Sequence, residues 1–130
     1  MKKVSLIFLL SMLCVSLLPA QESNDLIIKK LVICTSIEDR QPVGADSTFS
    51  KDVGKLYCFT NVVGAKDTCN ISQRWYYQNE EMANIKLAIK AKTWRTWSSK
   101  KIVPFAKGKW HVDVVSENGT VLATKKFKIE

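Results

Sequence analysis

Histidine occurs only once in this chain of 130 residues, at His111, and the four cysteines form no Cys-x-x-Cys pair. A structural zinc site needs four such ligands at close spacing, so the sequence predicts no metal site. The five glycines form neither a Gly-x-Ser-x-Gly elbow nor a phosphate-binding loop, two common signatures of hydrolases and nucleotide-binding proteins. We therefore expect no cofactor and no catalytic residue.

A serine–histidine–aspartate set can still be written from Ser98 or Ser99 with His111 and Asp113. His111 and Asp113 are two residues apart, and side chains two apart on a strand point to the same face. We interpret His111 as a solvent-facing side chain and not as a catalytic base.

Long apolar runs are missing after the first twenty residues. Two lysines precede an apolar run over residues 4–18, and a polar stretch follows it. This order is typical of a secretory signal peptide, and the run is short for a membrane span, which needs roughly 20 apolar residues. We expect a signal-peptide helix over residues 1–20, cleaved near Ala20. One exported domain, residues 21–130, would remain, periplasmic or extracellular and without a transmembrane span; an uncleaved N-terminal anchor is the alternative.

Charge is unevenly distributed along the chain, which carries a net charge of +8. Residues 21–81 have 7 basic and 9 acidic side chains, whereas residues 82–130 have 11 basic and 3 acidic ones. A basic half fits a polyanion such as an acidic polysaccharide or anionic lipid headgroups. We prefer a simpler interpretation of the basic half, in which lysines cover the solvent face of the strands and prevent edge-to-edge pairing. We do not expect a nucleic-acid partner.

Three cysteines follow the signal segment: Cys34, Cys58 and Cys69. In an oxidising compartment the simplest arrangement is one disulfide and one free thiol. Cys34 and Cys58 both lie within apolar strands and are the preferred pair. A Cys58–Cys69 disulfide and three buried, reduced thiols are the alternatives.

Alternation with a period of two residues, which is typical of strands, runs through the chain after the signal segment. The predicted strands cover residues 30–36, 55–63, 70–77, 82–89, 93–99, 110–114 and 121–129. Turns are predicted at residues 41–44, which contain proline and glycine, and at residues 117–119, which contain an Asn-Gly pair. Residues 78–80 are predicted to connect two strands as a hairpin. Seven or so short strands with regular turns predict an all-β fold, an antiparallel immunoglobulin-like β-sandwich.

The large aromatic side chains divide between core and surface. The predicted core residues are Trp75, Trp94, Trp110 and Phe127. Trp94 and Trp97 are three residues apart on one strand and so point to opposite faces, which leaves Trp97 at least half exposed.

Candidate binding residues are cations and an outward-facing aromatic: Arg74, Trp97, Lys100 and Lys101. A tryptophan ring can stack on a sugar or base while the cations meet an anionic group. Arg95 is expected to stack on a tryptophan and to bond backbone carbonyls, which is a structural role.

The order of these landmarks resembles the bacterial domain-of-unknown-function family 2914, over nearly all of the chain after the signal segment. The residues that carry the resemblance are Cys34 with Asp39-Arg40-Gln41-Pro42, residues 55–60, Gln73-Arg74-Trp75, Met82-Ala83, Trp94-Arg95-Thr96 with Ser98, Ser99 and Lys100, Gly108-Lys109-Trp110, Asn118-Gly119, Val121-Leu122 and Phe127. Similar proteins often have histidine at the position of Gln73. The resemblance implies a small domain, often outside the cytoplasm, with no assigned reaction.

These observations favour an exported, non-catalytic module that binds a protein partner or an anionic envelope glycan. A small enzyme that uses polar groups around Gln73 and Arg74 is one alternative. A structural accessory domain without a ligand is the other.

Overall fold

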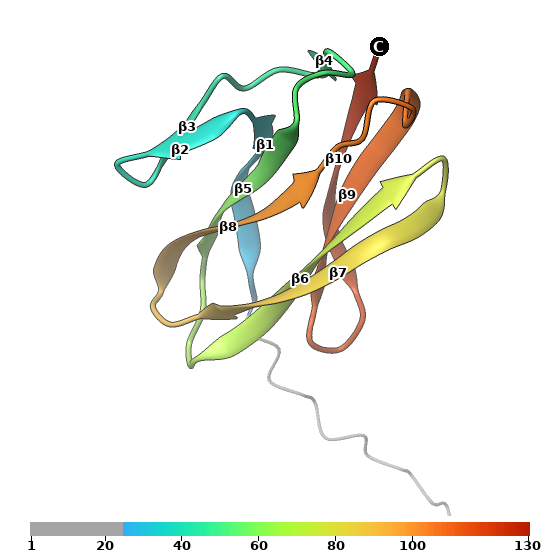
Figure 1. The fold of residues 1–130 in the computed structure, drawn as a ribbon. Helices are drawn as coiled ribbons and strands as arrows, with labels where there is room; N and C mark the ends of the chain where they lie inside the picture. The colour runs from blue at the N-terminus through green and yellow to red at the C-terminus, as the bar shows by residue number, and fades with distance from the viewer. Residues whose placement is uncertain (1–24) are drawn as a thin grey trace, which may run out of the picture.

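The computed structural model describes residues 25–130, which form an all-β fold (Figure 1). The predicted signal peptide and its cleavage near Ala20 lie outside the described residues. Ten strands are present: β1 (Ile27–Cys34), β2 (Ser36–Glu38), β3 (Gln41–Val43), β4 (Thr48–Phe49), β5 (Lys55–Val63), β6 (Cys69–Tyr77), β7 (Glu80–Ile89), β8 (Thr93–Lys101), β9 (Gly108–Ser116) and β10 (Val121–Ile129). Within residues 25–130 no helix is long and apolar enough to cross a membrane.

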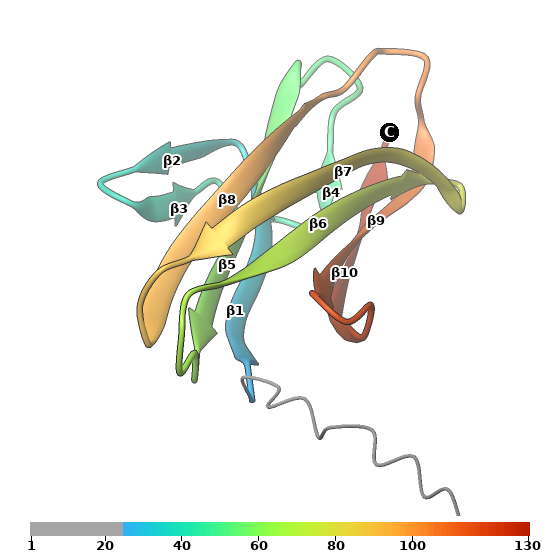
Figure 2. The ribbon, with the colours of Figure 1, turned by 90° about the horizontal axis from the view of Figure 1, so that it is seen from below.

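The seven long strands form two sheets that face one another (Figures 1 and 2). The first has the order β1-β5-β8 and the second the order β4-β10-β9-β6-β7. Long strands pair antiparallel throughout, and only the two-residue β4 pairs parallel, with β10. The seven predicted strands therefore correspond to the seven long ones, and the short β2, β3 and β4 are additional.

Alternating side chains build the core between the two sheets. One cluster contains Leu56 and Cys58 from β5, with Trp75, Trp110 and Phe127 from the opposite sheet. A second cluster, at the other end of the interlayer space, contains residues such as Val62, Ile71 and Ile89, and the half-buried Trp94 packs against it. Trp75, Trp110 and Phe127 are buried as predicted. Within residues 25–130, each cluster joins strands of the two sheets.

Three buried polar side chains and the indole N–H of Trp75 form a hydrogen-bond network that joins the two sheets. Gln73 of β6 is fully buried and donates a hydrogen bond to Thr60 of β5 at 2.8 Å. The Ser98 hydroxyl of β8 donates to the Gln73 side-chain carbonyl and accepts a bond from the Trp75 indole N–H at 3.0 Å. Buried polar groups are costly unless they are paired, so this network fixes how the two layers face each other.

The predicted turn at residues 41–44 is wrong, because residues 41–43 form β3. The turn lies earlier, at Asp39 and Arg40, whose φ angles of 52° and 61° are left-handed. β2 and β3 form a small hairpin that projects beside the three-stranded sheet in both views (Figures 1 and 2).

The predicted Cys34–Cys58 disulfide is also wrong, because all three described cysteines are free and buried. Cys58 is aligned with Ile33 on β1, whereas Cys34 is aligned with Tyr57. This offset of one residue sends the two thiols to opposite faces of the three-stranded sheet. The alternative of three reduced, buried thiols agrees with the structure.

Burial raises the pKa of the Cys58 thiol well above its ordinary value of 9.0, and the neighbouring Cys34 raises it further. A raised pKa in the folded state means that this thiol contributes stability below its unfolded pKa, and that the contribution is lost as pH rises through the folded pKa. We expect a disulfide-exchanging thiol reagent at pH 8 to label the described cysteines only after denaturation. From about pH 9 upward the urea midpoint of the native chain should fall more steeply than that of Cys58→Ala. Rapid labelling of the folded protein would contradict the burial of these three thiols.

Candidate functional site

The outer face of β6 carries a row of polar side chains. Ile71, Gln73 and Trp75 point into the core, so the alternate residues of the strand face outward. This row consists of Asn70, Ser72, Arg74 and Tyr76. A strand with one buried and one polar face therefore displays these side chains along its outer surface.

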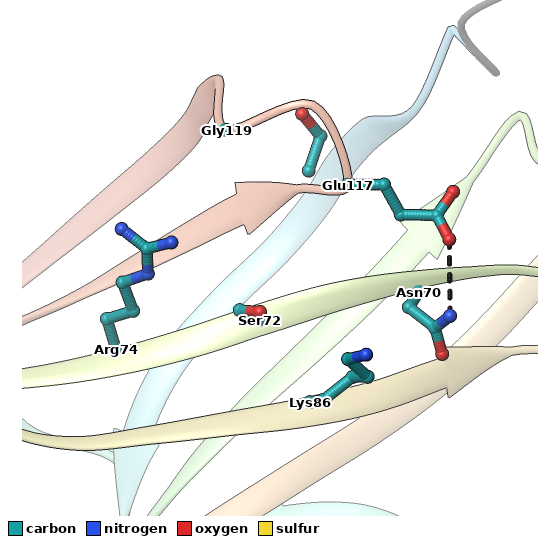
Figure 3. Close-up of a pocket in the computed structure, with 7 residues that line it drawn as sticks. Asn70, Ser72, Arg74, Lys86, Glu117 and Gly119 are labelled. Atoms are coloured by element: carbon teal, nitrogen blue, oxygen red, sulfur yellow. Dashed lines mark hydrogen bonds between the residues drawn. The ribbon is translucent and has the colours of Figure 1, made fainter.

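Asn70, Ser72 and Arg74 of this row line a hollow of about 300 Å³, together with residues of neighbouring elements. Lys86 of β7 is aligned with Ser72 and lies beside it. Ser116 at the end of β9 also lines the hollow. The turn between β9 and β10 contributes Glu117 and Gly119 (Figure 3). We call this hollow, lined by Asn70, Ser72, Arg74, Lys86, Ser116, Glu117 and Gly119, the Arg74 hollow.

The β9–β10 turn is held in a fixed shape at the rim of the hollow. Gly119 has a φ of 88°, which glycine adopts without strain, and its N–H donates to the Ser116 carbonyl at 3.0 Å. The Asn70 amide donates to the Glu117 carboxylate at 3.2 Å and so ties the turn to β6 (Figure 3). Hydrogen bonds therefore hold the rim of the hollow in place before any ligand binds.

Arg74 brings a positive charge to the hollow. Within residues 25–130 neither Arg74 nor Lys86 forms an ion pair. The Nε atom of Arg74 is buried and has no hydrogen-bond acceptor. Asp113 is aligned with Arg74 on β9, but its carboxylate accepts a bond from Thr124 at 2.7 Å. Buried donors normally have partners. Because this Nε is enclosed by the protein, an external acceptor would meet the part of the Arg74 side chain that lines the hollow.

The structure separates the predicted binding residues. Arg74 lies on the outer face of the five-stranded sheet, whereas Trp97 lies on the outer face of the three-stranded sheet. Lys101 shares the face of Trp97, because the two are four residues apart on β8. Lys100 points to the other side and donates to the Lys101 carbonyl at 3.2 Å. The four residues therefore form no single surface.

Trp97 is half-buried and already has packing partners. Its ring stacks on Phe59 with a centroid distance of 6.3 Å and an angle of 13°. The Arg40 guanidinium lies 5.8 Å from the centroid of the Trp97 ring. Arg95 donates to the Arg40 carbonyl at 3.2 Å, so its predicted bond to a backbone carbonyl is confirmed, although Arg40 supplies the contact with tryptophan. Trp97 thus helps to fasten the β2–β3 hairpin to β8.

Gln73 and Arg74 cannot act on one substrate together. Gln73 is sealed in the core, whereas Arg74 is directed outward from the same strand. His111 stacks on Tyr76 with a centroid distance of 4.6 Å and lies 4.0 Å from Asp113, on the outer face as predicted. Ser98 lies on the other sheet and inside the core. In the described part of the chain no cluster of three or more metal-ligating side chains occurs.

The comparisons with known proteins agree with the resemblance and assign no reaction. The family model of a protein of unknown function (DUF2914) matches residues 69–129, which confirms the resemblance over β6 to β10. The Arg74 hollow lies within this matched segment. No curated protein matches the chain.

Solved structures give a weaker likeness. A crystal structure of beta-glucosidase from Kluyveromyces marxianus is similar over 81% of this chain, with 14% sequence identity and a TM-score of 0.45. The match spans only 14% of the beta-glucosidase chain. This likeness has no bearing on function.

Proposed function

We propose that this chain is an exported, non-catalytic module of immunoglobulin-like sandwich build, and that it holds an anionic group of an envelope glycan or protein partner in the Arg74 hollow. The sequence supports export through its signal-like start. The two facing antiparallel sheets support the sandwich architecture.

The observation that carries the proposal is Arg74, which forms no ion pair within residues 25–130 and lies at one end of a preformed polar hollow (Figure 3). Arginine presents several N–H donors in a planar fork that matches a carboxylate or phosphate. Lys86 adds a second positive charge, and the Ser72 hydroxyl can donate or accept. Together these groups suit a ligand that combines an acidic group with hydroxyls.

Glu117 gives the hollow a direction. Its carboxylate is held by Asn70 at the end remote from Arg74 (Figure 3). An anionic group is therefore repelled from the Glu117 end and attracted to the Arg74 end, whereas a hydroxyl or N–H group of the same ligand can donate to Glu117. A uronic-acid polymer has this combination of groups at every sugar.

We expect Arg74→Ala to lower the affinity of residues 21–130 for a polygalacturonate probe by roughly tenfold to a hundredfold, because a charge-assisted hydrogen bond contributes about 1.5–3 kcal/mol. Arg74→Lys should restore only part of this affinity, since lysine cannot make the two-pronged contact. The measurement is isothermal titration calorimetry at low and high salt.

The matched control is Lys90→Ala, which removes one exposed positive charge from the β7–β8 turn, at a position that does not line the hollow. Equal losses for Lys90→Ala and Arg74→Ala would show that only net charge matters. Binding of an uncharged glucan as tightly as of polygalacturonate would also exclude an anion site. Either outcome would overturn the proposed function.

A further inference from the structure

The connection between β8 and β9 carries the most exposed large apolar side chain of the described residues. Phe105 has 84% of its surface in solvent. Its neighbours Ile102 and Ala106 are 2% and 5% exposed and belong to the core cluster. The loop is therefore anchored by its ends while its central aromatic ring points away from the protein.

Hydrogen bonds hold this loop in one shape. The Ala106 N–H donates to the Val103 carbonyl at 3.0 Å and closes a turn around residues 104 and 105. The Trp110 indole donates to the Ala106 carbonyl at 2.9 Å, and the Tyr77 hydroxyl donates to the Lys107 carbonyl at 2.7 Å. The exposed ring thus stands on a rigid support, and ordering the loop would cost little on binding.

Lysines surround the base of this turn. Lys100 and Lys101 end β8, and Lys107 follows Phe105 by two residues. Lys55 is aligned with Lys101 on the neighbouring strand. None of these four lysines forms an ion pair within residues 25–130. Lysine side chains can extend their charged ends while their stems lie along apolar surface.

The acidic side chains near this end are partly neutralised. Asp52 lies 3.3 Å from Lys51, and Glu130 lies 4.0 Å from Lys128. Glu80 and Glu81 stand on the β6–β7 hairpin, which Tyr77 and Gln78 bond to the carbonyls of residues 107 and 109 beside this turn. Their negative charges oppose the attraction of the lysines, so Phe105 and the lysines have to approach an anionic surface ahead of that hairpin.

We propose that this turn docks the protein on an anionic lipid surface, with Phe105 inserted among the headgroups and Lys55, Lys100, Lys101 and Lys107 against the lipid phosphates. A single projecting aromatic ring needs a soft, penetrable partner, whereas a protein partner needs a pocket of matching shape. Lysines close to an anionic leaflet each add a favourable contribution, and the ring gains from leaving water. This inference is independent of the Arg74 hollow, which lies on the outer face of the five-stranded sheet.

The test is co-sedimentation of residues 21–130 with vesicles of phosphatidylglycerol and phosphatidylcholine, compared with phosphatidylcholine alone. The native segment should bind the anionic vesicles, and the binding should largely disappear at about 1 M salt, where the Debye length falls to about 3 Å. Phe105→Ala and the double variant Lys100→Glu with Lys101→Glu should each weaken binding about tenfold or more.

Two matched variants separate this site from general effects. Ile27→Ala removes another exposed apolar side chain, 61% exposed, at the start of β1. Lys90→Glu with Lys92→Glu makes the same charge change in the β7–β8 turn, at the opposite end of β8. Both should bind like the native segment. Equal losses in these controls, no preference for anionic vesicles, or capture by a protein without vesicle binding would overturn the proposal.

Discussion

Trp75→Ala is expected to lower the free energy of unfolding by about 3–5 kcal/mol, because it opens a cavity in the centre of the core. Trp75 is fully buried, and its ring meets Phe127 edge-on at 6.1 Å. Its indole N–H also donates to Ser98, so the truncation removes one bond of the polar network. A loss of this size is a large share of the stability of an ordinary domain. Urea unfolding followed by circular dichroism measures the effect.

Two further variants divide this loss into its parts. Trp75→Phe keeps one aromatic ring but removes the indole donor and part of the packed volume, so we expect a loss of at least about 1–2 kcal/mol. Phe105→Ala is the control, because truncation of an exposed aromatic side chain should change stability by less than about 0.5 kcal/mol. A loss of under about 1 kcal/mol for Trp75→Ala would mean that the two sheets are not packed through this residue.

The strands could be predicted wherever two faces of a strand differ in character. β5 begins and ends at the predicted residues 55 and 63. The apolar face of β7 is turned toward the core, where Ala83 and Ile85 pack against the cluster that contains Trp75. The β2–β3 hairpin was not predictable in this way, because Pro42 and Gly44 resemble a turn more closely than Asp39 and Arg40 do. Pro42 is tolerated in β3 because that strand belongs to a hairpin of two strands.

The alternation of apolar and polar residues does not determine the register in which two strands pair. Cys34 and Cys58 were correctly placed in strands, and an offset of one residue between β1 and β5 decides that their thiols point apart. The same holds for the Arg74 hollow. A β-bulge between Trp75 and Tyr76 shifts the pairing with β7 by one residue, so that Ser72 is aligned with Lys86 and not with Ile85.

Arg74 could be chosen from the sequence as a candidate, but its surroundings could not. Its neighbours in the hollow come from β7 and from the β9–β10 turn, which are separated from it along the chain. The Asn-Gly pair predicts that turn, yet nothing in the pair says that Glu117 will reach Asn70. The same is true of Trp97, whose partner Arg40 lies on the hairpin that the sequence did not reveal.

Gln73→Glu is the second substitution with a large expected effect, about 3 kcal/mol or more at pH 7. The side chain is fully buried between Thr60 and Ser98, and neither neighbour is a cation. A carboxylate at this position loses its water without gaining a counter-charge, so the carboxyl should hold its proton, with a pKa well above about 4.3. In its protonated form it resembles the native amide in shape and can still donate one hydrogen bond.

The sign of the pH dependence follows from this raised pKa. Relative to the native chain, the variant should approach normal stability below about pH 4, where the carboxyl is protonated in both the folded and the unfolded states. As pH rises above the unfolded pKa, stability should be lost by about 1.4 kcal/mol per pH unit until the folded pKa is reached. Urea unfolding of both chains between pH 4 and pH 8 measures this difference.

Gln78→Glu is the matched control, because it makes the same chemical change at an exposed position of the β6–β7 turn. It should show no such pH-dependent loss. If Gln73→Glu were as stable as Gln78→Glu at pH 7, position 73 would have access to water, and a site shared by Gln73 and Arg74 would again be possible. A steep loss for Gln73→Glu alone would instead assign Gln73 to the joining of the two sheets and leave ligand binding to the outward-facing residues of β6.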